Sequence, residues 1–483
     1  MTTTSEAERG LSVRFARRAQ RGLLLGFSGP RVAALGAAGA IVVAALFVGG
    51  PVALAIAGVL WIPLTLSALV RIAGRPAAEW AGTAAAYETR KATGQGEFRA
   101  RLATPRPAGT LALPGDAASL RLHLDEESGA VMVHDPHRES LTAILSVSHP
   151  AFALLDDADR TGRVARWGRV LAGLAGGGGC VSLQVLEATI PDPAVGPRDW
   201  WEAKGVRDAG FAATTYQALL DQVSLGSSTH RSTIALTLDL RGAARAVRAA
   251  GRGLRGGAAV LRGDMASLAE AVHLAGLRTT GWLDEADLAR IVRHAFDPAV
   301  DLSRDAPGAH LGHAGPLAVS ERWDSLRHDS GYSAVLWIAE WPRIAVPPDF
   351  LHPIVFAPGI RRSLSLFLRP LPTDLALRQI RREKTASLAD AAQKSKVGQL
   401  ADLADAQEYE DLLARERSVI SGHTDLELTG LVSVTASSTE GLEAAVAAIT
   451  RAGAQACCEL RPVYGHQLQA FVAGALPLGR RPF

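Results

Sequence analysis

An uncharged stretch near the N-terminus is the strongest pattern of apolar and polar positions in the chain. Residues 32–70 carry no charged side chain, and Gly49-Gly50-Pro51 divides them into two apolar runs, 32–48 and 52–70. A helix rises 1.5 Å per residue and the hydrocarbon core of a membrane is about 30 Å thick, so about 20 residues cross it once. The pattern therefore predicts two membrane-spanning helices joined by a tight Gly-Gly-Pro turn.

Basic residues flank this hairpin and set its predicted orientation. Arg31 precedes the first run and Arg71 follows the second, whereas the turn carries no Lys or Arg. Positive residues stay on the cytoplasmic side of a membrane, so we expect both chain ends in the cytoplasm, a two-span protein of the inner (plasma) membrane, and Trp80 as an interfacial anchor. A signal peptide is disfavoured because its apolar region has only about 7–15 residues and no second span.

After the hairpin, alternating and helical patterns predict an α+β body in the cytoplasm. The order strand, helix, strand occurs near both ends of this body. This order predicts two ferredoxin-like units whose antiparallel sheets are covered by helices on one face. The predicted segments are a basic lead-in (1–30), the transmembrane hairpin (31–71), a juxtamembrane helix with linker (72–114) and two α+β regions (115–300 and 301–483).

The second α+β region contains a long polar segment followed by a clear strand. Residues 373–420 are mostly charged, with a narrow apolar stripe that predicts one long helix or a helical pair. Residues 425–436 alternate between apolar and polar positions and predict a strand. Ser437–Glu440 then has the spacing of a capping box before a further helix that ends near Ala452.

Composition excludes several classes of protein. The net charge of +3 is small, so the chain does not resemble a dedicated nucleic-acid binder, and nucleic acid is expected only as a possible cargo of a larger complex. The three cysteines are too few for a disulfide framework. We expect the adjacent Cys457 and Cys458 to be small apolar residues in a reducing compartment.

The candidate catalytic and metal-binding motifs are weak. Gly176–Gly179 is followed by Cys180 rather than Lys-Ser or Lys-Thr, so no phosphate-binding loop is predicted. The histidine pairs at 134/137 and 310/313 lack the further ligands that a structural zinc ion needs. We therefore expect no enzyme activity, no cofactor and no metal. The alternative from another class is a membrane-tethered enzyme, which would need His310, His313 and His328 to converge on one pocket with a carboxylate.

One ordered charge pattern lies in the middle of the body. Five arginines follow one another in steps of four, three, four and three, which places them on one face of a helix. This face could contact acidic lipid head groups, an acidic partner or transferred DNA. A solvated helix face is the favoured interpretation, because glycines at 251, 253, 256 and 257 weaken the helix. The five are Arg241, Arg245, Arg248, Arg252 and Arg255.

Short motifs near the C-terminus carry a resemblance to a known family. Gly422-His423, Leu442-Glu443-Ala444-Ala445-Val446 and Leu476-Pro477-Leu478-Gly479 occur in that order. This layout resembles the end of the N-terminal domain of the large conjugation (type IV secretion) ATPases. The two-span hairpin resembles the small inner-membrane subunit often fused to that ATPase. Together they resemble the actinobacterial integral-membrane conjugation subunit, which is partnered by a separate ATPase chain.

The resemblance implies a membrane-anchored scaffold rather than a motor. No Walker residues can be carried over, so we expect a separate secretion ATPase to dock on this chain, beside other membrane channel subunits in a multi-subunit complex. A membrane component of a type VII-like secretion system is the close alternative. Docking would use edge pairing by strand 425–436 and complementary charge on the long helix. The tentative docking residues are Arg381, Arg382, Lys384, Leu476, Pro477, Leu478 and Gly479.

Overall fold

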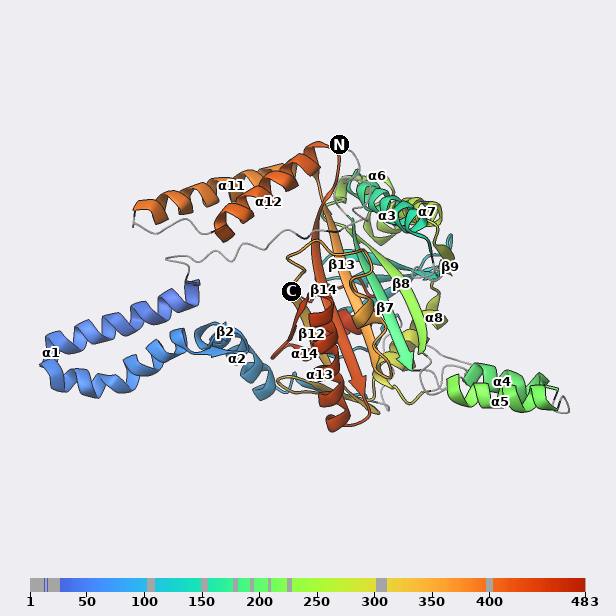
Figure 1. Ribbon diagram of the computed structural model, residues 1–483, viewed down its shortest axis with the longest axis horizontal. Coiled ribbons are helices and arrows are strands. Elements are labelled where there is room, and N and C mark those ends of the chain that lie inside the picture. Colours follow the sequence, from blue (N-terminus) through green and yellow to red (C-terminus); the bar gives the residue numbers. More distant parts are fainter. Residues whose placement is uncertain are drawn as a thin grey trace, which may run out of the picture. The chain divides into compact units, whose positions relative to one another are not determined.

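The protein is described by a computed structural model, in which the chain divides into two compact units (Figure 1). The body comprises Met1–Ala16, Gly96–Val463 and Gln467–Phe483, and the N-terminal unit comprises Arg17–Gln95 and Tyr464–His466. The residues described within them are Val13, Phe15, 27–101, 109–148, 155–176, 181–191, 195–206, 210–223, 228–300, 311–396 and 403–482.

The N-terminal unit is built on α1 (Gly29–Leu69), which is a single apolar helix of 41 residues with an interruption at its middle. Gly49 and Gly50 have non-helical backbone angles, and φ is +60° at Gly50, which favours glycine. Nε of Arg31 donates a 3.0 Å hydrogen bond to the carbonyl oxygen of Ala68, although a straight helix of this length would separate its ends by about 60 Å. The interruption therefore falls at the predicted Gly-Gly-Pro position, and the chain direction changes there.

A short hairpin and a second helix follow α1 in the same unit. β1 (Arg71–Ile72) pairs with β2 (Arg75–Pro76), and α2 (Ala77–Ala92) begins directly afterwards. This helix lies within the segment 72–114, for which the sequence predicts a helix and a linker. Its Trp80 donates a 3.0 Å hydrogen bond to the carbonyl oxygen of Ile72, so its indole group holds the hairpin to the helix.

The body is organised around one antiparallel sheet of 13 strands rather than two separate sheets. In its first half, strands and helices alternate in an order that begins with a three-stranded meander. The elements are β4 (Arg121–Leu124), β5 (Val131–Asp135), β6 (Ser140–Ser148), α3 (Asp157–Gly176), β7 (Val181–Pro191), α4 (Val195–Lys204), α5 (Phe211–Val223), β8 (Ser228–Asp239), α6 (Ala244–Ala249), α7 (Gly253–Leu274), β9 (Arg278–Trp282) and α8 (Glu285–Phe296).

The second half repeats this order of elements. Before it come β3 (Glu97–Arg99), the short 3-10 helix Gly115–Ser119 and α9 (Leu311–Ala314). The repeated elements are β10 (Ala318–Glu321), β11 (Leu326–His328), β12 (Gly331–Glu340), α10 (His352–Val355), β13 (Arg361–Leu371), α11 (Thr373–Lys396), α12 (Leu403–Ile420), β14 (Asp425–Ala436), α13 (Thr439–Gln455), β15 (Glu459–Pro462) and α14 (Gln467–Ala475).

Strand pairing gives both halves the same topology. The order is β9-β6-β8-β7 in the first half and β15-β12-β14-β13 in the second, which is the order of a ferredoxin-like unit with a helical insertion. The halves join edge to edge, because β7 pairs with β13 from Leu183↔Leu368 to Thr189↔Arg362. The two α+β regions expected from the sequence are thus halves of one folded body.

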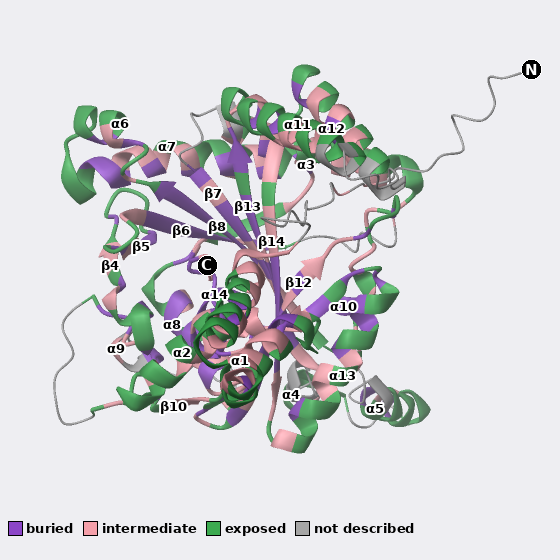
Figure 2. Cartoon of the chain, turned by 90° about the vertical axis from the view of Figure 1, so that its left-hand side faces the viewer, coloured by how far each residue is buried: buried purple, intermediate pink, exposed green. Residues whose placement is uncertain are grey.

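Helices cover both faces of the sheet, which corrects the expectation of one covered face. Leu236 of β8 packs in a cluster with α3 and α7, whereas its neighbour Ala235 packs on the other face with α8 and α14. In the second half, Val432 and Val434 of β14 pack against α13. The buried central strands lie between these helical layers (Figure 2). The last helix of each half therefore lies on the face opposite its neighbours: α8 opposite α3 and α7, and α14 opposite α13.

Candidate functional site

The apolar surface of α1 is the first candidate site. Among the residues that the structure describes, α1 is the one helix long and apolar enough to span a membrane, and its most apolar window is not buried. Phe47 and Val48, beside the interruption, are 88% and 87% exposed. Small residues, including Ala34, Ala38 and Gly58, are the buried ones, as in close helix packing. This exposed apolar surface is suited to lipid or to another membrane helix.

The predicted anchoring residues take distinct places in the N-terminal unit. Arg31 packs over the ring of Phe27 at 4.8 Å and bonds to Ala68, and Arg71 is exposed on β1. Trp80 lies half-buried with its ring 5.3 Å from that of Tyr464. The two arginines lie at or just beyond the ends of α1, and the indole lies in α2, which follows it.

The helical pair α11–α12 is the second candidate site. It connects β13 to β14 and is held together by two ion pairs, Lys384–Glu416 at 2.8 Å and Arg415–Glu383 at 3.0 Å. Lys384 is therefore committed to an internal contact, which corrects its assignment as a docking residue. The helical pair, one of the two arrangements predicted for residues 373–420, is confirmed as α11 and α12. Val397 and Leu400, which belong to the apolar stripe of that segment, lie outside the described residues.

The outer face of α11 remains available for a partner. Arg381, Leu388 and Ala392 are exposed, and their spacing places them on one side of the helix. Arg382 is exposed beside them. Neither the guanidinium of Arg381 nor that of Arg382 has a hydrogen bond or an ion pair with any described residue. A charged and apolar face of this kind is typical of a site that binds another protein.

The other tentative docking residues are part of the core. Leu476, Pro477 and Leu478 are buried, with Leu476 fully so, and they extend the core from the end of α14. Gly479 has φ of +65°, and a Cβ there would lie 1.9 Å from Oγ1 of Thr237. These residues therefore close the fold and offer no surface to a partner. Strand β14 lies between β12 and β13, and its residues Leu431–Thr435 pair with both neighbours, whereas Asp425–Gly430 pairs with β13 alone.

The histidines of the enzyme alternative are not assembled into a site by the described residues. His328 is fully buried, with Nδ1 2.6 Å from the carbonyl oxygen of Phe296 and Nε2 2.7 Å from Oγ of Ser333. Burial lowers its pKa, so it is a neutral core residue. His310 lies outside the described residues, and His313 belongs to α9. No group of three potential metal ligands occurs among the residues described.

The predicted arginine stripe is broken. α6 ends at Ala249, and α7 begins at Gly253 after Arg252 takes a φ of +64°, so no single helix carries the five arginines. Arg241 lies in the turn before α6 and pairs with Glu139 at 2.6 Å. The glycines that weakened the sequence pattern separate the two helices, so these arginines do not form one regular face.

A third candidate site, which the sequence did not predict, consists of two cavities in the body. The two adjoining cavities lie beside the sheet: one of about 50 Å³ where the halves meet, and one of about 380 Å³ within the first half. The smaller lies between the strand ends of β7, β8, β13 and β14 and the helices α8 and α14. Arg231, Thr233 and Ile291 line both cavities. The site is thus built from both halves of the body.

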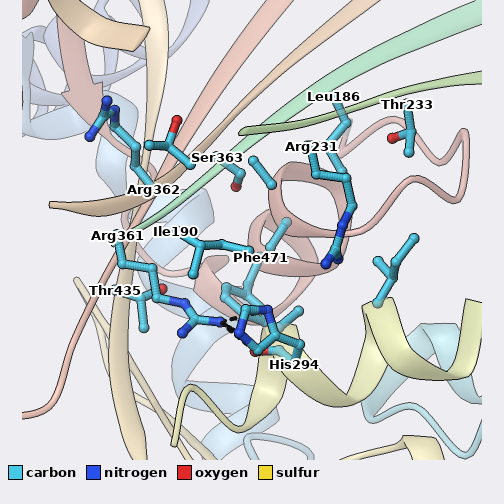
Figure 3. A pocket seen from close by; sticks show the side chains of 15 residues that line it. Leu186, Ile190, Arg231, Thr233, His294, Arg361, Arg362, Ser363, Thr435 and Phe471 are labelled. Atoms are coloured by element: carbon cyan, nitrogen blue, oxygen red, sulfur yellow. Dashed lines mark hydrogen bonds between the residues drawn. The ribbon is translucent and has the colours of Figure 1, made fainter. Parts of the chain in front are cut away.

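Three arginines, Arg231, Arg361 and Arg362, are among the residues that line the smaller cavity (Figure 3). Nη2 of Arg361 lies 2.8–2.9 Å from both ring nitrogens of His294 and donates a 2.8 Å hydrogen bond to the His294 carbonyl oxygen. Arg231 extends into the cavity from β8, whereas Arg362 points away from His294. Arg362 instead bonds to the carbonyl oxygens of Ala357 and Ile360.

Burial and mutual repulsion shape the charges in this cavity. Burial, together with Arg231, lowers the pKa of Arg361 to about 10, and burial, together with Arg290, lowers the pKa of Arg231. Both remain cations at neutral pH. Burial and the two arginines lower the pKa of His294 to about 3, so its ring is neutral. The cavity therefore combines two positive charges with a neutral ring and is suited to an anion.

The one sequence signal for this site is an arginine in the polar start of a strand whose continuation is mostly apolar. Arg231 precedes the buried run 233–238 of β8, and Arg361 begins β13. In comparisons with known proteins, no protein-family model and no curated protein matches the chain.

Proposed function

We propose that the chain is a membrane-anchored docking subunit of a conjugation-like secretion machine and recruits a separate ATPase. α1 would cross the inner membrane twice, with its interruption on the outer side and the body in the cytoplasm. The proposal joins the C-terminal motif resemblance to the exposed apolar surface of α1.

The contact of the N-terminal segment with the body is the observation that carries the topology. Val13 and Val346 exchange backbone hydrogen bonds of 2.8 and 3.1 Å, and the ring of Phe15 stacks on Trp341 at 5.0 Å. Val13 and Phe15 precede α1, and the rest of the body follows it. A single crossing would leave these partners on opposite sides of the membrane. Their common fold therefore supports entry and exit of α1 on the same side.

The outer face of α11 is the proposed contact for the ATPase. Arg381 and Arg382 lack partners among the described residues, and the neighbouring Leu388 is 57% exposed. An acidic and apolar surface on the ATPase would complement this combination. The ion pairs of Lys384 and Arg415 hold α11 against α12, so the exposed face of α11 has a fixed position on the helical pair.

Co-purification from membranes in mild detergent tests this function. We expect a Walker-motif ATPase to be recovered with the wild-type chain, and a double variant with Arg381→Glu and Arg382→Glu to recover it several-fold less. Arg451→Glu, at an exposed position of α13, is the matched control and should recover it normally. Recovery of no such ATPase, or equal recovery by all variants, would contradict the proposal.

A further inference from the structure

We propose that the smaller cavity, at the junction of the two halves, binds the phosphate monoester group of a small molecule or lipid. Arg231, Arg361 and Thr233 would contact the phosphate oxygens. The larger cavity, which Arg231 and Thr233 also line, would hold the rest of the ligand.

Missing counter-charges are the first argument. The guanidinium of Arg231 has no hydrogen bond or ion pair with a described residue, and the partners of the Arg361 guanidinium are carbonyl oxygens and the neutral ring of His294. The nearby carboxylates are committed elsewhere, since Asp297 pairs with Arg293 and Asp287 pairs with Arg290. Buried cations without counter-ions are costly, so an anion between Arg231 and Arg361 would remove an unfavourable interaction.

An unpaired hydroxyl is the second, independent argument. Thr233 is 2% exposed, and its Oγ1 has no hydrogen-bond partner among the described residues. By contrast, the buried hydroxyls of Ser363 and Thr142 bond to Gly474 and Thr237. Buried polar groups are normally paired, so the partner of Thr233 should be a molecule that enters the cavity. Because Thr233 and Arg231 share one face of β8, the same molecule can contact both.

The size and chemistry of the cavities indicate the ligand class. About 50 Å³ holds about four water molecules and therefore suits a compact tetrahedral anion rather than a larger group. Guanidinium groups bind phosphate through paired N–H donors, and a hydroxyl can complete the set. The larger cavity has polar walls that include Thr280 and Asp287, so the remainder of the ligand should be polar.

Thermal unfolding of the full chain in phosphatidylcholine nanodiscs tests the site, with inorganic phosphate as the probe and chloride at matched ionic strength as the control. We expect phosphate to raise the unfolding temperature. Arg231→Gln should weaken the apparent affinity about tenfold or more, and Thr233→Val several-fold. Arg248→Gln removes an exposed arginine that has no partner among the described residues, and it should bind as wild type does.

A second set of nanodiscs containing phosphatidic acid separates the two sources of the phosphate group. Stabilisation by inorganic phosphate in both membranes would assign the site to a soluble ligand. Stabilisation by inorganic phosphate only in the membranes without phosphatidic acid would mean that the lipid head group already occupies the site, and would assign the site to the lipid. The absence of phosphate-specific stabilisation in both membranes would overturn the proposal. So would wild-type affinity in Arg231→Gln or, if that variant does not fold, in Thr233→Val.

Discussion

The backbone N–H of Gly479 donates a 2.7 Å hydrogen bond to Oε1 of Gln184, which lies 295 positions earlier in the chain. Nε2 of Gln184 lies 2.9 Å from the carbonyl oxygens of both Ala473 and Leu476. Gln184 belongs to β7 in the first half of the body and is fully buried. One amide side chain therefore joins the first half to the end of α14 in the second.

Gln184→Leu should destabilise the body by about 2–4 kcal/mol, because it leaves several buried backbone groups without partners. Chemical unfolding followed by tryptophan fluorescence measures this change. Gln379→Leu, at an exposed position of α11, removes a hydrogen bond to Glu383 and should change the free energy of unfolding by less than about 0.5 kcal/mol. Equal stability of the two variants would show that the Gln184 contacts do not hold the halves together.

Gly479→Ala should destabilise the body more than Gly359→Ala does. Both glycines have φ near +65° to +69°, so the backbone strain of an alanine is similar, at about 1 kcal/mol. A Cβ at Gly479 would also meet Thr237 and Thr142, whereas one at Gly359 would have no atom within 4 Å. We expect a further loss of about 1–3 kcal/mol at Gly479 from this overlap. Similar unfolding curves for both variants would contradict the close packing of the C-terminal segment.

Cysteine labelling in intact cells tests the proposed two-span topology. In a background without native cysteines, Val48→Cys should react with an impermeant thiol reagent, because Val48 lies beside the interruption of α1 and is highly exposed. Thr3→Cys should react only after the membrane is opened. Labelling of Thr3→Cys in intact cells would rule out a cytoplasmic N-terminus, and protection of Val48→Cys would rule out an outward-facing turn.

Stability should fall between pH 6.5 and 3 through His294. Its folded pKa of about 3 lies below the ordinary value of 6.5, so the unfolded chain binds more protons in this interval. Stability is complete above pH 6.5 and decreases as the pH falls towards 3, by roughly 4 kcal/mol from this residue. His294→Asn should flatten that part of the curve of unfolding free energy against pH. An unchanged slope in the variant would show that His294 is not kept neutral.

Local chemistry explains what the sequence predicts well. Gly49-Gly50-Pro51 interrupts α1 because glycine takes positive φ and proline lacks a backbone N–H. Strand 425–436 is confirmed as β14 with the bounds expected from its alternation. The helix start is also found, although one residue later than the capping box at Ser437–Glu440 predicts: the N-cap is Ser438, whose Oγ accepts a 3.0 Å hydrogen bond from the N–H of Gly441. Each of these features depends on residues close together in the chain.

Contacts between distant residues explain what the sequence does not predict. The Leu-Pro-Leu-Gly motif is buried because Gln184, in the other half, binds it. The pairing of β7 with β13 turns two expected sheets into one, and no pattern within either strand specifies its neighbour. The cavity around Arg231 and Arg361 depends on that pairing, so its residues share no motif in the sequence.

The junction of β7 and β13 also determines how the body carries force. The two strands run antiparallel, so the helical insertions that follow them, α4–α5 and α11–α12, leave the sheet at opposite ends (Figure 1). A force that pulls these insertions apart acts on the hydrogen bonds between β7 and β13 along the strand direction. The ladder from Leu183↔Leu368 to Thr189↔Arg362 then resists in shear, with its hydrogen bonds loaded together rather than one after another. The body would therefore resist a force that pulls these two insertions apart.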